Sequence, residues 1–162
     1  MSFSIAPGKI LKLPVEQVLL ISRVQGSGGQ FELIQQATKN LNDISTQNML
    51  LVAIEAIATA LGIPAIAGIC AKDQISVELC ASVDALYNVY DEFWRKHGGE
   101  KVKDDLFFLP VPLPHKTISM IKRDHRCRVK YKRQLKKELM EQVCRTFEQK
   151  CLKDGARRLS NI

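Results

Sequence analysis

Three glycines and two long polar side chains stand close together at residues 23–29, in the sequence RVQGSGG. Glycine lets the backbone adopt positive φ angles and approach a ligand closely. The free N–H groups at the start of a following helix attract anions, so such a segment suits a diphosphate. The alternative is a plain glycine-rich turn between two elements. The predicted cofactor-binding residues are Arg23, Gln25, Gly26, Ser27, Gly28 and Gly29.

A strand and a helix are expected on either side of this segment. Val15 to Val24 alternates in the manner of a strand, and Gln30 to about Leu41 follows as a helix. A second helix, opened by Ser45 or Thr46 as N-cap and carrying apolar residues from Met49 to Leu61, is apolar nearly all round and should be buried. Gly62 ends it, and Ile63 to Cys70 is predicted to be a buried parallel strand.

Further strands and helices are predicted before Val15 and after Cys70. Short β-type runs are predicted at Ser2 to Ile5 and Lys9 to Leu13, and a strand at Leu106 to Leu109. A helix is predicted at Ser82 to Lys96, and His97-Gly98-Gly99 should end it. From about Ile118 the pattern predicts a basic helix or helix pair. Its apolar stripe has a spacing of four residues and comprises Leu135, Leu139, Val143, Phe147 and Cys151.

The helix at Ser82 to Lys96 carries the candidate catalytic residues Tyr90, Asp91 and Trp94. A tyrosine hydroxyl can donate a proton to a leaving thiolate. Trp94 would form a wall of the acyl pocket, and Asp91 would orient a substrate amine or serve only as a solvated or capping group. The structural alternative is that aromatic residues at this i, i+4 spacing belong to the core.

Composition indicates one ordered domain spanning residues 1–162, with a core at 1–115 and a basic helical segment at 116–162 packed on it. The net charge is +7, but it is unevenly distributed. Residues 1–115 hold nine Lys/Arg and twelve Asp/Glu, whereas residues 116–162 hold fifteen and five. The basic segment could meet an acidic protein, an anionic lipid, nucleic acid or cofactor phosphates, or could be a solvated helix face.

Cysteine and histidine spacing predicts no metal site. The five cysteines form no Cys-x-x-Cys pair, and their odd number favours reduced thiols in a cytoplasmic protein. The three histidines share no ligand spacing with them. No signal peptide or membrane span is expected, because the apolar runs are short and interrupted by charge.

Several segments in order resemble the VirK/YbjX family of bacterial proteins. The match includes the residues from Ile21 to Gly26, the helix from Met49 to Leu61 and the motif Tyr-Asp-Glu-Phe-Trp at Tyr90 to Trp94. It continues through Phe108-Leu109-Pro110 and the basic stretch from Arg126 to Arg133, and so covers most of the chain. Members of this family typically carry a further N-terminal region, and no function of that region is transferred.

The spacing Arg-x-x-Gly-x-Gly from Arg23 to Gly28 also resembles the pyrophosphate loop of the GNAT acyltransferases, Gln/Arg-x-x-Gly-x-Gly/Ala. In that superfamily the loop binds coenzyme A and is followed by a helix, a parallel strand, a second helix and a final strand. The resemblance implies a catalytic tyrosine where this chain has Trp94, and Tyr90 lies one turn earlier on the same helix face.

The expected fold class is α/β, a GNAT-like mixed sheet with flanking helices and a basic C-terminal helix. The expected function is transfer of an acyl group from an acyl-CoA or acyl-carrier-protein (acyl-ACP) thioester to an amine or hydroxyl of a small molecule or peptide. An acyl carrier protein is the partner that the basic helix favours, since carrier proteins are acidic. Nucleic acid is disfavoured, because Tyr131 is a single aromatic residue among the basic ones. The alternative is a non-enzymatic binding module that uses the basic face on an acidic partner protein or a membrane surface.

Overall fold

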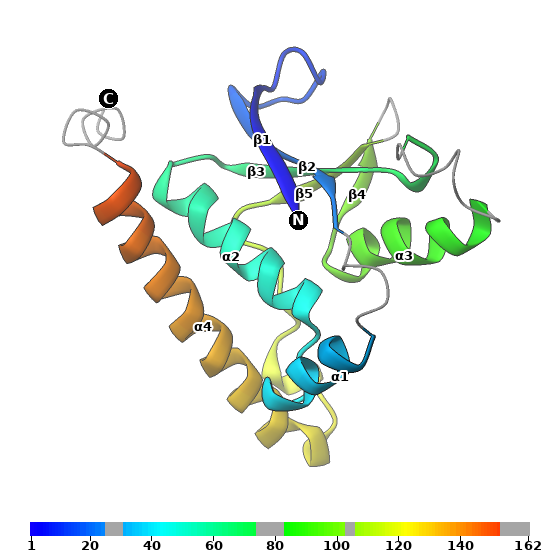
Figure 1. The fold of residues 1–162 in the computed structure, drawn as a ribbon, viewed down its shortest axis with the longest axis vertical. Helices are drawn as coiled ribbons and strands as arrows, with labels where there is room; N and C mark the ends of the chain where they lie inside the picture. The colour runs from blue at the N-terminus through cyan, green and yellow to red at the C-terminus, as the bar shows by residue number, and fades with distance from the viewer. Residues whose placement is uncertain (25–30, 74–82, 103–105, 153–162) are drawn as a thin grey trace. The chain divides into compact units, whose positions relative to one another are not determined.

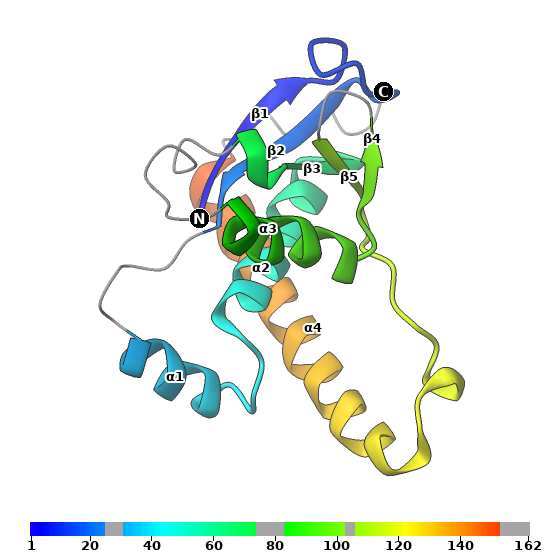
Figure 2. The same cartoon turned by 90° about the vertical axis from the view of Figure 1, so that its right-hand side faces the viewer.

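The computed structural model describes residues 1–24, 31–73, 83–102 and 106–152, and it is mixed α/β as predicted. Its strands are β1 (Ser2–Pro7), β2 (Gln17–Arg23), β3 (Ala65–Ile69), β4 (Glu100–Val102) and β5 (Leu106–Pro110). Its helices are α1 (Phe31–Asn40), α2 (Thr46–Ala60), α3 (Val83–Lys96) and α4 (Arg123–Cys151). Figures 1 and 2 show these elements in two views.

The chain forms two compact units. The first, here the sheet unit, comprises Met1–Gln25 and Ile63–Pro114, and therefore all five strands and α3. The second, here the helical unit, comprises Gly26–Gly62 and His115–Ile162 and contains α1, α2 and α4. Each unit is assembled from two segments that are far apart in the sequence, so neither could be recognised as a continuous stretch of chain.

The five strands form one sheet in the order β1-β2-β3-β5-β4. The neighbours β2 and β3 run parallel, as the sequence predicted, and the other three neighbouring pairs are antiparallel. Because directly paired residues lie on the same face, the register places Leu19, Ile66 and Leu109 on one face. All three are fully buried, which explains the continuous apolar run of β3.

The opposite face of the sheet is covered by the chain between β1 and β2. Leu13 from this connection packs with Val18, Ala65 and Ala67 in an apolar cluster. The predicted strand at Lys9 to Leu13 was wrong, because this stretch forms consecutive turns. The amides of Ile10, Leu11 and Lys12 donate to the carbonyl oxygens of Pro7, Gly8 and Lys9. The alternating apolar residues of this stretch cover a face of the sheet, and the stretch does not add a strand to it.

Helix α3 packs against this sheet through η1 (Ala71–Asp73) and β5. It ends as predicted from the two glycines after His97. The amide of Gly98 donates to Arg95 O and that of Gly99 to Trp94 O, at 3.0 and 2.9 Å, and Gly98 has a φ of +82°. The edge strand β4 was not predicted. It has only three residues, two of them charged, and so lacks the apolar signal of a strand.

The helical unit is built around α2. Ser45 is its N-cap, with Oγ accepting from Asn48 N at 3.3 Å, and Gly62 follows its end with a φ of +68°. Both helix ends were predicted. The expected burial of α2 is confirmed over much of its surface, including Leu51, Ile54 and Ala58.

Helix α4 is one continuous helix of 29 residues that packs along α2 (Figure 1). The predicted stripe from Leu135 to Phe147 is half-buried, but Cys151 is exposed, so its assignment to the packed stripe was wrong. No residue of α4 is fully buried. In the part of the chain that the structure describes, no helix has the length and apolar character needed to cross a membrane.

Candidate functional site

The candidate catalytic residue Trp94 lies on the buried face of α3 and is fully inaccessible to solvent. Its indole Nε1 donates to the carbonyl oxygen of Ile69 at 3.1 Å, at the end of β3. The ring lies directly over Gly68, where a Cβ atom would be 2.3 Å from Trp94 Cε2. Trp94 therefore joins α3 to the end of a central strand, and this close approach requires a glycine in that strand.

Gly68 is a structurally constrained position that the sequence reasoning missed. An isolated glycine inside the apolar run of β3 was the available signal, because such a glycine often marks close approach of another group. Gly68 has no positive φ angle, and its conformation is open to other residues. The requirement for glycine is therefore set by the space that the indole occupies.

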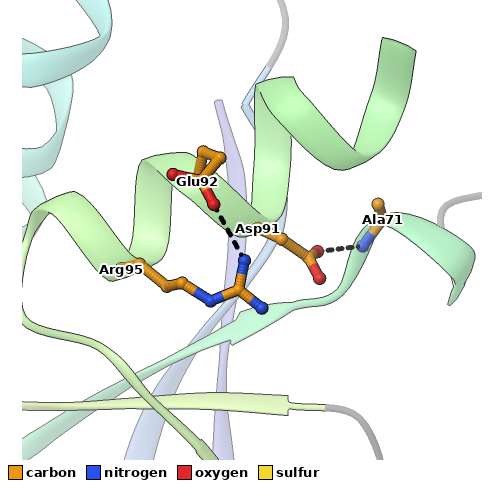
Figure 3. Close-up of polar contacts among 4 residues, drawn as sticks. All are labelled: Ala71, Asp91, Glu92 and Arg95. Atoms are coloured by element: carbon orange, nitrogen blue, oxygen red, sulfur yellow. Dashed lines mark hydrogen bonds and ion pairs between the residues drawn. The ribbon is translucent and has the colours of Figure 1, made fainter. Parts of the chain in front are cut away.

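Asp91 is 3 % exposed and also contacts the chain just beyond β3. Its Oδ1 accepts from the amide of Ala71 at 2.8 Å (Figure 3). A carboxylate that accepts a backbone N–H makes a strong, directional contact. This contact fixes the first residue of η1. Asp91 is therefore buried and not a solvated group, and its role toward a substrate amine stays a prediction.

Tyr90, the predicted proton donor, is 2 % exposed, and its hydroxyl oxygen is buried. It precedes Asp91 on the side of α3 that also buries Phe93 and Trp94, while Glu92 and Arg95 lie on the exposed side and form an ion pair at 3.0 Å (Figure 3). The ring of Phe93 contacts that of Trp94 edge-on, with centroids 5.0 Å apart. The core alternative for the aromatic motif is thus supported by its burial, and catalytic roles stay predictions.

The parallel strands β2 and β3 end at the same edge of the sheet, beside these α3 contacts. Their ladder contains three residue pairs: Leu19 with Ile66, Leu20 with Ala67 and Ile21 with Gly68. Beyond it, Arg23 pairs with Ser2 of β1, and Ile69 pairs with Leu106 of β5. Each strand therefore continues with its outer neighbour after their mutual pairing has ended. Ligands of α/β sheets commonly bind at the carboxyl ends of parallel strands.

The predicted cofactor-binding residues fall at this edge only in part. Arg23 is exposed at the end of β2. Gln25, Gly26, Ser27, Gly28 and Gly29 lie outside the described residues, so their role stays a prediction. Cys70, at the end of β3, is buried, as expected of a cysteine that packs. We call the ends of β2 and β3, from Arg23 to Val24 and from Ile69 to Ala71, the strand edge.

The basic face of α4 is the second candidate site, and much of its charge is used within the helical unit. Arg128 pairs with the carboxylate of Asp43, and Lys132 Nζ donates to Asp43 O at 2.9 Å. Arg126 donates through Nε to Ile121 O at 2.9 Å. Arg133 donates to Lys116 O. These side chains hold the α1–α2 turn and the 116–121 segment against α4.

Asp43 therefore has a structural role that the sequence reasoning missed. Both Asn42 and Asp43 have positive φ angles, of 54° and 58°, in the turn between α1 and α2. Asn42 Nδ2 lies 3.4 Å from the hydroxyl of Tyr131, and the residues around this contact line a shallow depression of about 300 Å³. The available signal was a turn of Asn and Asp in a chain whose C-terminal segment is strongly basic.

The other reactive side chains that the structure describes do not form a site. Burial, the charge of Glu148 and a hydrogen bond to Glu148 raise the pKa of the Cys144 thiol, which makes it a weaker nucleophile at neutral pH. His97 Nδ1 lies 2.7 Å from Phe93 O, which supports its predicted place at the C-terminus of α3. Within the described ranges, no group of three or more His, Cys, Asp or Glu side chains could hold a metal ion.

Comparison with known proteins places the chain in a family. No curated protein matches the chain, and no solved structure does. A family model described as "Protein of unknown function (DUF535)" matches residues 8–149. This family covers the VirK/YbjX proteins, so that resemblance is confirmed. Since the match extends over most of its length, the chain belongs to the DUF535 family.

Proposed function

We propose that this protein is an acyltransferase that moves an acyl group from a CoA or carrier-protein thioester to an amine or hydroxyl. The observation that carries the proposal is the end of the parallel ladder at Ile21 and Gly68 while β2 and β3 both continue. Ligands of α/β sheets commonly bind where parallel strands end, although Ile69 O and Ala71 N are already bound there by Trp94 and Asp91. In the proposal, other backbone N–H groups near this strand edge polarise the thioester carbonyl.

The order of elements supports the same proposal. The segment 25–30 follows β2 and precedes α1, and β3 then returns parallel to β2. The resemblance to GNAT enzymes implied the order strand, glycine loop, helix and parallel strand, and this chain departs from it by having two helices, α1 and α2, before β3. In the proposal, Arg23 and the amides of residues 25–29 bind the diphosphate of CoA or the single phosphate of a carrier protein's phosphopantetheine group.

The proposed reaction needs positioning of the reactants and two proton transfers. The acceptor nitrogen or oxygen attacks the thioester carbon, a C–N or C–O bond forms, and the C–S bond breaks. The acceptor loses a proton to solvent or a base, and the departing thiolate takes one from the Tyr90 hydroxyl. Asp91 and Trp94 would act through the end of β3, because they hold Ala71 and Ile69. They are positioning residues in this scheme.

Ligand binding tests the proposal directly. CoA, an acyl-CoA series and an acyl carrier protein should raise the melting temperature by mass action. Gly28→Asp should abolish the shift, because a carboxylate in the loop repels the diphosphate. Asn40→Asp, which adds the same charge at the exposed end of α1, is the matched control and should keep the shift. Absence of a shift with every chain length and with the carrier protein would overturn the proposal.

Turnover separates an enzyme from a thioester-binding protein. Tyr90→Phe should lower turnover with little change in thioester affinity, since the lost proton donation occurs only in the transition state. Circular dichroism and the melting temperature check that the buried Phe ring is accommodated. Unchanged turnover in a folded Tyr90→Phe protein would remove Tyr90 from the proposed mechanism.

A further inference from the structure

Seven of the ten basic residues of α4 form two groups that the sequence could not separate, and the other three are Lys136, Arg145 and Lys150. Arg126, Arg128, Lys132 and Arg133 contact oxygen atoms of the helical unit. A second group is exposed and comprises Arg123, Lys130 and Lys137. Among the described residues, the side chains of Arg123 and Lys130 have no hydrogen-bond or ion-pair partner. Lys137 lies 3.7 Å from Glu141, and both of these side chains are more than half exposed.

The exposed group has a regular geometry. Arg123, Lys130 and Lys137 are seven residues apart, which is about two helical turns, so they lie on one side of α4 at intervals of roughly 10 Å. The exposed pair of Lys137 with Glu141 contributes little free energy and would not prevent Lys137 from binding elsewhere. We call these three residues the cationic stripe.

The surrounding charge makes the cationic stripe strongly attractive to anions. Residues 116–137 contain ten Lys/Arg and one acidic residue, Asp124. This charge is concentrated in the N-terminal half of α4, where the helix dipole is also positive. Its self-repulsion opposes folding, and an acidic partner would relieve it.

We propose that the cationic stripe docks an acidic α-helix of a partner protein. A seven-residue repeat of cations matches a helix that carries carboxylates at the same repeat, as in the charge pairs that flank paired helices. Contacts between exposed charges favour fast association that is sensitive to salt. They also favour one register of the two helices over the others. Docking at this surface does not require acyl transfer, so the docking proposal can be tested independently of the proposed enzyme activity.

The distribution of arginines favours an acidic helix over nucleic acid. Guanidinium groups bind phosphates in a bidentate manner, and they are the usual choice for nucleic-acid backbones. Here Arg126, Arg128 and Arg133 already donate to oxygens of the helical unit. Tyr131 is the exposed aromatic residue of this region, and its hydroxyl is near Asn42. Two of the three cations in the stripe are lysines, which suit single carboxylates.

Two synthetic peptides of identical composition test the register. One is an alanine-rich helix with glutamates at a seven-residue repeat, and in the other the glutamates are scattered around the helix. Fluorescence anisotropy at low ionic strength, where surface charges are weakly screened, should show tighter binding of the repeat peptide. The stripe variant Arg123→Glu/Lys130→Glu/Lys137→Glu should weaken that binding by about tenfold or more.

A matched variant and a reversed peptide complete the experiment. Lys9→Glu/Lys39→Glu/Lys150→Glu changes the net charge equally at exposed positions outside the stripe and should lose much less affinity. A repeat peptide with lysine in place of glutamate should restore binding to the stripe variant. Equal binding of both acidic peptides, equal loss in the two variants, or tighter binding of duplex DNA or anionic phosphatidylglycerol vesicles would overturn the proposal.

Discussion

Helices α3 and α4 are held in their units by opposite means. In α3, four of the seven residues from Tyr90 to Lys96 are buried, and the indole of Trp94 lies directly against the backbone at Gly68. Helix α4 has 29 residues and buries none of them fully. Most of its described polar contacts to the rest of the helical unit come from long cationic side chains that bind Asp43 and backbone oxygens, and Tyr131 adds one to Asn42. Helix α3 is fixed by close packing of buried side chains. Helix α4 is fixed by its half-buried apolar stripe and by contacts of exposed charged side chains.

This difference changes how the two segments are interpreted. The motif Tyr-Asp-Glu-Phe-Trp has the residue types of an active site, yet Asp91 and Trp94 both stabilise the end of β3. The basic segment has the appearance of a uniform solvated face, yet its cations divide into structural and exposed groups. Stability should therefore depend far more on α3 than on the cations of α4.

Trp94→Ala should have the largest effect on stability. Removing a large buried aromatic side chain leaves a cavity and should lower the free energy of unfolding by about 3–5 kcal/mol. Urea denaturation followed by circular dichroism measures it, because Trp94 is the single tryptophan and its fluorescence is lost with it. A loss below about 1 kcal/mol would mean that α3 is not fixed by this contact.

Gly68→Ala should have an intermediate effect, with a specific dependence on Trp94. The added Cβ would lie 2.3 Å from the indole, so the ring must shift. Overpacking of this kind should cost about 1–3 kcal/mol. In a Trp94→Leu background the same substitution should cost much less, and the double-mutant cycle measures this coupling. Equal costs in both backgrounds would place the strain elsewhere in β3.

Arg128→Ala should have the smallest effect. The side chains of Arg128 and Asp43 are each 60 % exposed, so water screens their interaction. The pair should contribute about 0–1 kcal/mol, less at high salt. A double-mutant cycle with Asp43→Ala at two salt concentrations checks the magnitude and the screening. A coupling as large as that of Gly68 with Trp94 would remove the contrast between the two helices.

Much of the secondary structure could be predicted from the sequence, because its signals are local. The apolar period predicted α2, and Ser45 and Gly62 predicted its ends. The two glycines after His97 predicted the end of α3. The errors have local causes as well. Apolar and polar residues alternate from Lys9 to Leu13 as in a strand, but this stretch forms turns that cover a face of the sheet. Strand β4 is too short and too charged to be recognised.

The sites depended on contacts between distant residues. Trp94 donates to a carbonyl 25 residues earlier in the chain, and Arg128 binds an aspartate 85 residues earlier. Nothing near Trp94 in the sequence indicates that its indole requires Gly68. Similarly, nothing near Arg128 in the sequence indicates that its side chain pairs with Asp43.

The sequence by itself determined the helix and strand periods, the helix caps and the concentration of positive charge after residue 115. These depend on residues within a turn or two of one another. Only the tertiary structure decided the strand order, the end of the parallel ladder at Ile21 and Gly68, and which cations of α4 remain exposed. The reason is that strand pairing and side-chain burial depend on which distant segments come into contact. A given side chain binds its own chain or faces solvent depending on those contacts.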